Sequence, residues 1–491
     1  MDKPGPVNPY LDTPASPRPR IRVAGDATFG KRVLFGLGLF LFSSAVGLAL
    51  VRVRAAIVFA GLFGVFSVGT ILRRPWWGLL IYTAVFMIRP GELFPALARL
   101  RLEMIVGSVT LAGLAYQQYL RDGRLALDRS WQTRFLCLFV VAAFFSVPTS
   151  YWRSVSVDGV MTLLKILAFY IMVVHLVDTR VRLKVFIWTL LVLTIGVIAS
   201  SFEGTVYVKQ GIERVYGITS AVGGPNALGA TVAATFPLLL LLGLHKPLRG
   251  LRPLLLASCV MLVYVLSITG SRAGVLGFLG GLACLWWMSP RRVATGLVGV
   301  IVLVVAFTFL PNQYKQRYST ITSSTLDASS LGRIETWKDG MHMVADRPLL
   351  GVGINAFQTA HYVRDGWGLD AHSMYIQVLA EVGLIGAVPF FCFLVQMLIL
   401  NRRTARILES EPDWTFERVV LHGVFAGLVA LLIGATFGTQ YIKRLWYIYA
   451  AVQLVTLRCY VDEQQLGELH ELPKPQSSGK RRCESRASKV T

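Results

Sequence analysis

Long apolar runs, separated by short basic connectors, recur along the chain from Val33 to about Leu457. Each run of roughly 17–25 residues is long enough to cross a hydrocarbon core of about 30 Å as an α-helix. The strands of a membrane β-barrel would instead alternate in polarity over about ten residues, which excludes that class. The pattern predicts an all-α polytopic membrane protein with about 12–14 transmembrane helices.

The runs divide the chain into a membrane domain and two polar tails. Residues 1–32 are rich in proline and are expected to form a disordered cytoplasmic tail. Residues 33–457 form the transmembrane domain, and the basic residues 458–491 are expected to be a second disordered cytoplasmic tail. The candidate spans are 33–50, 55–72, 75–88, 104–119, 134–149, 158–177, 185–202, 225–244, 253–269, 273–288, 293–310, 373–399, 418–436 and 440–457.

Composition and charge change this picture only in detail. Hydrophobic residues make up 54% of the 491 residues and charged residues 15%, whereas soluble domains carry about 25% charged residues. A soluble enzyme is therefore excluded. The net charge of +22 would suggest a nucleic-acid partner in a soluble protein. Here the positive residues gather in alternate loops, so no nucleic-acid partner is expected.

The distribution of Lys and Arg predicts the orientation in the membrane. With a cytoplasmic N-terminus, 31 of the 49 Lys and Arg residues fall in cytoplasmic segments or at the span ends next to them, and 17 in outer segments or at the span ends next to those, while Lys165 lies deep in a span. Cytoplasmic loops of membrane proteins are enriched in these residues. Both termini are therefore predicted to be cytoplasmic, and membrane lipids are expected partners.

One predicted outer loop, residues 311–371, is 61 residues long. Loops of this length are usually functional or disordered. Apolar residues recur in it at helical spacing, which predicts an amphipathic helix on the membrane surface or over a cavity. This apolar stripe is expected mainly to pack against other parts of the protein and not to contact a ligand. Arg333 beside it either reaches into a cavity or is a solvated charge. The stripe consists of Leu331, Ile334, Trp337, Met341 and Val344.

The outer loop runs directly into a long apolar helix through His372. A single histidine is usually structural, but this one is predicted to lie at the membrane surface beneath a structured loop. Glu381 follows nine residues later, about 13 Å deeper along a helix. An ionisable residue inside a span is a functional candidate. Equally, Glu381 could hold helices together by hydrogen bonds.

Two further outer segments carry arginines. Arg214 lies in the segment 213–218, and Arg272 lies in a short hairpin, 269–274, between two spans. Taken singly, an arginine at such a position more often extends its side chain to the membrane interface and binds no ligand. Guanidinium, however, is the planar donor best suited to phosphate. Together with Arg333 and His372, these arginines are predicted to hold a leaving diphosphate and to activate a hydroxyl on one membrane face.

Several familiar signatures are missing from the sequence. No two aspartates are two residues apart, so the Asp-x-Asp pattern of metal-dependent glycosyltransferases is not present. The Gly-x-x-x-x-Gly-Lys loop of ATPases and the His-Glu-x-x-His motif of zinc proteases are also missing. No metal site and no cofactor are therefore expected.

In their order along the chain, these motifs resemble the O-antigen ligase and polymerase superfamily. The family's Arg-x-x-x-Leu element is matched by Arg214 with Ile218, and its Ser-Arg-small-Gly hairpin by residues 271–274. Its closing His-x10-Gly is matched by His372 and Gly383, although Ser373 stands where many members have Asn. The family's long outer loop is matched at Gly332, Arg333, Trp337, Pro348, Gly351 and Gly353.

The resemblance is good over about residues 200–400 and looser around Ile88–Glu92. It implies a GT-C-like helical fold and a metal-independent, inverting glycosyltransferase. The donor would be a glycan on undecaprenyl diphosphate, at the periplasmic face of a bacterial inner membrane. The acceptor hydroxyl would belong to lipid A–core, a growing polysaccharide or a protein.

The resemblance also implies roles for individual residues. Arg214 and Arg272, with Arg333, would bind the diphosphate, and His372 would activate or position the acceptor. Supporting roles are expected for Glu381, Tyr375 and Ser271.

The alternative is a multi-span transporter or flippase for lipid-linked oligosaccharide. It would have a similar number of spans and some buried charge. Transporters of this kind commonly contain internal repeats and a site at the midplane of the membrane. The motifs here are instead concentrated on one predicted face, which favours the enzyme.

Overall fold

The computed structural model describes residues 64, 66–203, 206–209, 212–220, 222–308, 312–319, 328–366, 368–409, 415–439 and 441–471. The elements discussed below belong to one compact unit that begins at Val68. Of the predicted spans, 33–50 and most of 55–72 lie outside the described residues, as does the predicted tail 1–32.

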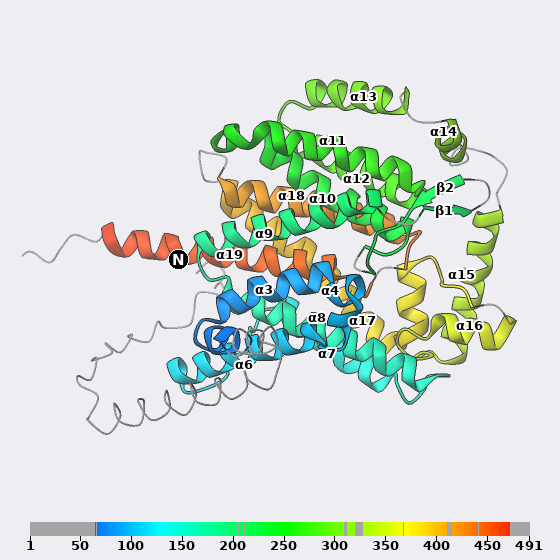
Figure 1. Ribbon diagram of the computed structural model, residues 1–491, viewed down its shortest axis with the longest axis horizontal. Helices are drawn as coiled ribbons and strands as arrows, with labels where there is room; N and C mark the ends of the chain where they lie inside the picture. Colours follow the sequence, from blue (N-terminus) through cyan, green and yellow to red (C-terminus); the bar gives the residue numbers. More distant parts are fainter. Residues whose placement is uncertain are drawn as a thin grey trace, which may run out of the picture. The chain divides into compact units, whose positions relative to one another are not determined.

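Long apolar helices dominate the described part of the chain, and they run roughly along one direction (Figure 1). They are α3 (Pro75–Ile88), α6 (Leu102–Asp122), α7 (Trp131–Phe145), α8 (Arg153–Leu176), α9 (Arg180–Ala199), α10 (Pro225–Leu244), α11 (Arg252–Thr269), α12 (Arg272–Met288), α13 (Arg292–Thr308), α17 (Met374–Glu409), α18 (Phe416–Ala435) and α19 (Arg444–Glu471).

Shorter elements gather at one end of these helices, here called the loop end (Figure 1). An antiparallel hairpin of two strands pairs Val206 with Val215. The elements of the loop end are α4 (Pro90–Leu93), α5 (Pro95–Ala98), η1 (Ser200–Glu203), β1 (Val206–Lys209), β2 (Ile212–Val215), α14 (Asn312–Ser319), α15 (Ala328–Asp346) and α16 (Phe357–Asp365). The helix η2 (Lys246–Leu251) connects α10 and α11.

The fold is that of an all-α polytopic membrane protein. Among the described residues, six helices are long and apolar enough to cross a membrane. Apolar side chains also face outward in mid-helix, as on α13, where Leu297 and Val304 are 63% and 59% exposed. Such a surface would be unusual in water but is expected where lipid surrounds the helices.

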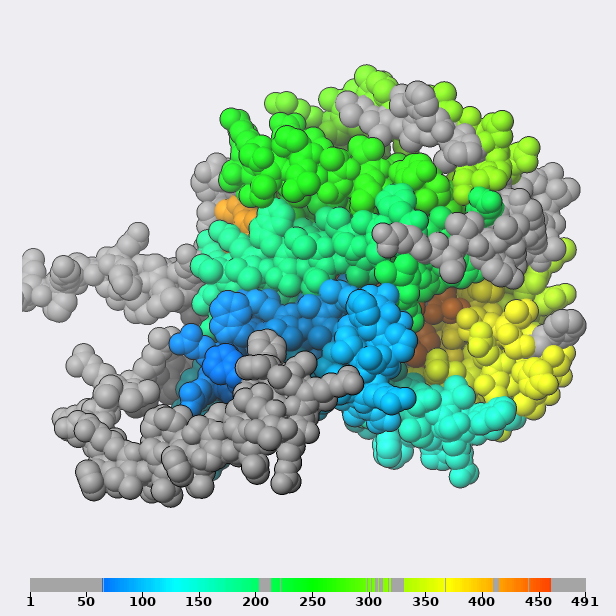
Figure 2. Space-filling view, in the orientation of Figure 1, coloured from blue at the N-terminus to red at the C-terminus, as the bar shows by residue number. Residues whose placement is uncertain are grey.

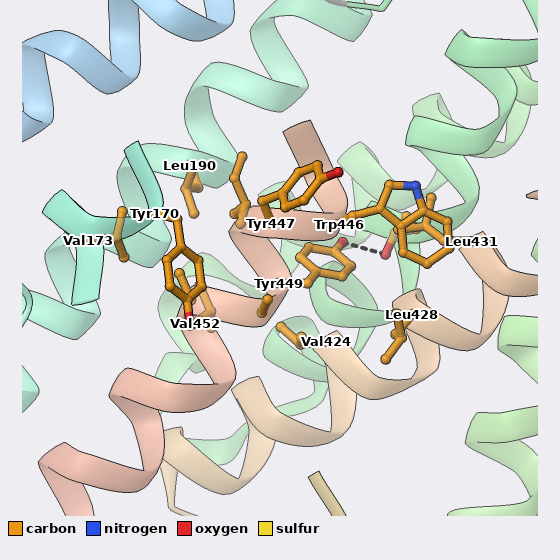
Figure 3. Close-up of a cluster of buried hydrophobic side chains, with 14 of the residues drawn as sticks. Tyr170, Val173, Leu190, Val424, Leu428, Leu431, Trp446, Tyr447, Tyr449 and Val452 are labelled. Atoms are coloured by element: carbon orange, nitrogen blue, oxygen red, sulfur yellow. Dashed lines mark hydrogen bonds between the residues drawn. The ribbon is translucent and has the colours of Figure 1, made fainter. Parts of the chain in front are cut away.

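Helix α10 lies at the centre of the packing and contacts α11, α12 and α18. Small residues permit this closeness, because Gly274 of α12 lies directly against the backbone of Gly229 of α10. On the other side of the bundle, α19 packs against α8, α9, α17 and α18. Figure 3 shows the aromatic side chains of α19, Trp446, Tyr447 and Tyr449, buried between these helices.

Helix bounds follow the predicted spans closely at some places and depart at others. Helices α3 and α10 coincide with the predictions 75–88 and 225–244. Helix α19 continues to Glu471, so residues 458–471, predicted as part of a disordered tail, extend a helix instead. The β1–β2 hairpin was not predicted, because the apolar pattern does not distinguish a four-residue strand from a loop.

The amphipathic helix predicted in the long loop is present as α15, but its buried face differs from the prediction. Leu331 and Met341 are both 50% exposed, whereas Thr336, Gly340 and Met343 are buried. The reason is close packing, since a side chain at Gly340 would collide with Ile376 of α17. A small residue therefore sets the contact face here instead of the largest apolar side chains.

Candidate active site

At the loop end, the two arginines that were predicted to act together adjoin the hairpin between α11 and α12. Arg214 is buried on β2, and its Nε donates to the carbonyl of Thr269 at 2.9 Å. Its Nη2 donates to the Asn226 side-chain oxygen at 3.3 Å. The contact with Thr269 ties β2 to the last residue of α11, and the contact with Asn226 ties it to the first turn of α10.

Arg272 begins α12 directly beside this network and is 8% exposed. Ser271 is the N-cap of α12, since its Oγ accepts from the Gly274 N–H at 3.1 Å. The same Oγ donates to Asn226 Oδ1 at 2.9 Å. Gly270 supplies the left-handed turn (φ 57°) that ends α11. Arg214 and Arg272 thus adjoin one rigid turn, 269–271, at the start of a helix.

The C-terminal end of α18 brings the other predicted residues to the same region. Gly434 lies against the backbone carbonyl of Ala273, one residue after Arg272. Tyr375 of α17 donates its hydroxyl to the carbonyl of Leu432 at 2.9 Å. Arg333 of α15 lies 5.9 Å from the ring centroid of Phe437, just after α18. Helices α12, α15 and α17 therefore meet around the segment 432–437.

Trp337 supports this arrangement from α15, with its ring 6.4 Å from that of Phe437. It lies one helical turn after Arg333, so both side chains reach the same aromatic residue. Arg333 is half-buried rather than fully solvated. Full solvation of the Arg333 charge does not fit this position, and its role in binding stays a prediction.

His372 lies two residues before α17, in a backbone conformation that is unusual for a residue with a side chain. Its φ is 49°, in the left-handed region. The neighbouring carbonyl of Ala371 accepts from Thr336 Oγ1 of α15 at 3.3 Å, and Ser373 and Met374 are buried. Contacts on both sides thus hold this conformation, and constrained residues of this kind cluster at functional sites.

Glu381 has a clear structural task. Its fully buried carboxylate accepts from the backbone N–H groups of Asn355 at 2.6 Å and Phe357 at 3.2 Å. Gln377 donates to it at 2.8 Å, and the Tyr441 hydroxyl donates to the other oxygen. The carboxylate therefore joins α17 to the segment before α16 and to the segment before α19. This supports the interpretation of Glu381 as a residue that holds elements together.

The glycines of the long-loop motif have a related role. Helix α17 is broken at Gly383, whose φ of 58° and ψ of −167° interrupt the helix. Across the break, the Leu384 N–H donates to the Pro348 carbonyl, and the Val352 and Gly353 N–H groups donate to the carbonyls of residues 380 and 381. Positive φ angles at Gly351 and Gly353 make this pairing possible.

A second basic cluster lies at the loop end and was not predicted as a site. Lys443 donates to the carbonyl of Ser220 at 3.4 Å, and Arg89 pairs with Glu92 at 2.5 Å and with Ser220 Oγ. Arg444 pairs with Glu103 at 3.4 Å and donates to a carbonyl of α3. The Ile88–Glu92 motif was the sequence signal for this cluster, but nothing in the sequence connected it with residues 220 and 443.

Electrostatics mark this cluster as a region of positive potential. Burial, followed by the charges of Arg444 and Arg89, lowers the pKa of Lys443 to about 8. Burial opposes the charge on Glu92, but hydrogen bonds from Ser220 and Arg89 lower its pKa overall. Asp370, near the site segment that contains His372, has a pKa raised by burial, and Thr439 and Lys443 partly offset this rise.

One group of side chains with metal-ligating atoms occurs among the described residues, at α15 and α16. Atoms of Asp339, His361 and Asp365 lie within 4.8 Å of one another. His361 Nε2 is 3.3 Å from the Asp339 carboxylate. A histidine between two aspartates is also an ordinary ion-pair arrangement, and Asp365 is exposed. No sequence motif connects these three residues, because they are separated along the chain.

Comparison with known proteins agrees with the family resemblance. Residues 256–391 match the model of the family described as O-antigen ligase. The matched segment contains Arg272, Arg333, His372 and Glu381. The resemblance inferred from the motifs is therefore confirmed over this segment.

Two curated proteins are also similar over part of their length. A Rickettsia felis protein, whose name describes it as a candidate polysaccharide ligase, is 23% identical over 153 residues, covering 28% of this chain and 38% of that protein. A Rickettsia conorii protein with the same description is 24% identical over 161 residues, covering 28% of this chain and 37% of that protein. The chain thus aligns with less than two fifths of either relative.

Proposed function

We propose that this protein is a glycosyltransferase of the ligase or polymerase type. It transfers a glycan from undecaprenyl diphosphate to an acceptor hydroxyl at the periplasmic face of a bacterial inner membrane. The family match over residues 256–391 and the names of the two relatives support a transfer of lipid-linked glycan. The acceptor class is lipid A–core, a growing polysaccharide or a protein.

The observation that carries the proposal is the placement of two buried arginines beside one helix start. Arg214 and Arg272 adjoin the turn 269–271, and the hydrogen bonds to Thr269 and Asn226 orient the Arg214 guanidinium before any ligand arrives. A pre-oriented cation needs little reorganisation to stabilise charge that develops on a leaving diphosphate. The positive end of α12 adds to the same field.

The chemical step follows from these positions. The acceptor oxygen attacks the anomeric carbon of the donor sugar while the bond from that carbon to the diphosphate oxygen breaks. The electron pair of the broken bond stays on the polyprenyl diphosphate, which Arg214 and Arg272 stabilise. His372 takes the acceptor proton or orients the hydroxyl. A single displacement of this kind inverts the anomeric configuration, and the arginines supply the positive charge that a metal supplies elsewhere.

The test is transfer by the purified protein in detergent. A labelled glycan on undecaprenyl diphosphate should pass to an acceptor without any ion gradient, and EDTA should leave the rate unchanged. Arg272→Ala should reduce the rate by at least about 10²-fold, as expected for the loss of a preorganised donor to the leaving group. Arg272→Lys should recover little, because it keeps the charge but loses the bidentate geometry.

The outcome also separates the enzyme from a transporter. A protein that moves lipid-linked sugar across vesicle membranes but forms no glycosidic bond would overturn the proposal. Strong inhibition by EDTA would be consistent with a transferase but would contradict the metal-independent mechanism.

A further inference from the structure

Helices α15 and α16 of the long outer loop pack against each other at the loop end (Figure 1) and bring three side chains with metal-ligating atoms together. Nε2 of His361 is 3.3 Å from a carboxylate oxygen of Asp339 and 4.0 Å from one of Asp365. Ligand atoms that surround one zinc ion tetrahedrally, at about 2.0–2.1 Å, are about 3.3 Å apart. The first distance fits such a site, and a rotation of the Asp365 side chain would shorten the second.

The packing of the two helices fixes the direction of the imidazole. Phe357, His361 and Asp365 are spaced four residues apart and therefore share one face of α16. The His361 ring stacks on the Phe357 ring, with centroids 6.4 Å apart. Phe357 is fully buried, and a side chain at Gly340 of α15 would begin 3.1 Å from its ring. Only 5% of the His361 side chain is exposed, so its Nε2 is held toward the two carboxylates.

The charges of this group do not balance. The neighbouring Asp346 pairs with Arg364. Among the residues that the structure describes, Asp339 and Asp365 form ion pairs with His361 and with no lysine or arginine. A protonated imidazole could compensate one carboxylate, but the other would keep its charge. Two carboxylates that converge on one imidazole therefore favour an additional cation.

Asp365 also lies at the end of a helix that disfavours a carboxylate. It is the last residue of α16, and Gly366 follows it as the C-cap with a left-handed φ of 76°. The C-terminus of a helix carries partial negative charge and favours cations. Figure 2 shows the yellow part of the chain, which includes α16, at the surface of the molecule. A cation from solution can therefore reach this position, where it would offset both the carboxylates and the helix end.

We propose that Asp339, His361 and Asp365 bind one divalent transition-metal ion of the Zn²⁺ type. Zinc takes histidine nitrogen and carboxylate oxygen together, whereas calcium and magnesium take oxygen ligands. Three protein ligands leave a coordination position for water. The Asp339 and Asp365 side chains are 23% and 43% exposed, which leaves room for that water. The sequence predicted no metal site because these ligands form no contiguous motif.

The proposed ion is structural. Asp339 comes from α15 and the other two ligands come from α16, so the ion joins these helices. Helix α15 also contacts the segment before His372 through Thr336, and Glu381 holds the start of α16 through the Phe357 N–H. None of the three ligands is assigned to the donor or the acceptor. The metal-free protein should therefore still transfer glycan below its melting temperature. Metal binding is measured without transfer, so the failure of either proposal is distinguishable from that of the other.

The experiment is a zinc titration of the purified full-length protein in detergent, with the affinity tag removed. Bound metal is first stripped with EDTA, which is then dialysed away. Isothermal titration calorimetry gives affinity and stoichiometry, and thermal melting with and without Zn²⁺ gives the stability. Asp365→Asn removes an exposed ligand and keeps its size. Asp346→Asn is the matched control, because Asp346 is likewise the last residue of its helix, α15.

We expect the wild type to bind one Zn²⁺ per chain and to melt at a higher temperature when Zn²⁺ is present. Asp365→Asn should bind at least about tenfold more weakly and lose this rise, whereas Asp346→Asn should keep both. Without metal, Asp365→Asn should melt no lower than the wild type, because it removes a charge that repels Asp339 and the helix end. Equal zinc affinity in the wild type and Asp365→Asn would overturn the proposal. So would a lower melting temperature of metal-free Asp365→Asn, which would identify an ordinary ion pair with His361.

Discussion

Arg214 and Ser271 share one hydrogen-bond acceptor, the side-chain oxygen of Asn226, although they come from a strand and from a helix cap. Asn226 therefore fixes the Arg214 guanidinium relative to the turn that presents Arg272. The Asn226 amide thus positions two other groups, the Arg214 guanidinium and the Ser271 hydroxyl. The motifs did not indicate this role.

Asn226→Ala should impair the use of the donor more than the chemistry that follows. We expect KM for the polyprenyl-diphosphate donor to rise about tenfold, because a fixed guanidinium becomes mobile, while KM for the acceptor stays unchanged. Steady-state kinetics with each substrate varied in turn measures both. Thr231→Ala, on the other face of α10, is the control. Equal losses for both substrates would contradict a specific role beside Arg214.

His372→Ala should lower the transfer rate by about 10²–10⁴-fold, the usual contribution of general acid–base catalysis. Donor binding should persist, since the arginines remain. His372→Gln distinguishes the roles, because glutamine can orient a hydroxyl but cannot take its proton. Near-normal turnover of His372→Gln would show that His372 only orients the acceptor hydroxyl. If His372→Ala abolished donor binding, the residue would belong to the diphosphate site instead.

Glu381→Ala should destabilise the protein strongly, because four donors from three segments would lose their acceptor. Each charged hydrogen bond contributes about 1.5–3 kcal/mol, and a buried group left unpaired costs a similar amount. Glu381→Gln should recover part of the stability. Thermal melting and protease resistance of the loop 348–357 measure this effect. If Glu381→Gln melted like the wild type but transferred nothing, Glu381 would be chemical rather than structural.

Cysteine labelling tests the orientation of the chain. Val363 on α16 is 58% exposed and Val181 at the start of α9 is 71% exposed. In intact spheroplasts, an impermeant thiol reagent should label Val363→Cys but not Val181→Cys, with the native cysteines as background. Both should react after permeabilisation. The reverse pattern would place the arginine turn in the cytoplasm and would invalidate the periplasmic site.

The sequence predicts the long helices well, because length and apolar content are local properties. Pro225 and the run that follows it define α10 to the residue, since proline is favoured in the first helical turn. The break in α17 is different. From the sequence alone, Gly383 is an ordinary glycine within a helix. The interruption depends on hydrogen bonds between residues 348–353 and the backbone of α17 on both sides of Gly383. That pairing is tertiary and leaves no periodic signal.

Likewise, only some residues of the candidate site could be predicted from the sequence. Motif order indicated Arg214, Arg272, Arg333 and His372. The structure places Arg214 and Arg272 at one turn, Arg333 beside Phe437, and His372 just before α17. Motif order could not indicate Asn226 or Lys443. The contacts of Asn226 with Arg214 and Ser271, and of Lys443 with the Ser220 carbonyl, are tertiary. Nor could it choose between the two interpretations of Glu381, because the donors come from positions 355, 357, 377 and 441.

The first turn of α10 supports two elements at once, because Asn226 contacts both Arg214 of β2 and Ser271, the cap of α12. Two events that act on one rigid segment are thermodynamically linked whenever either of them shifts it. The factor by which a bound diphosphate stabilises the ordered turn 269–271 must equal the factor by which ordering that turn raises the affinity for diphosphate. A protein built this way couples the affinity for an anion to the order of a helix cap.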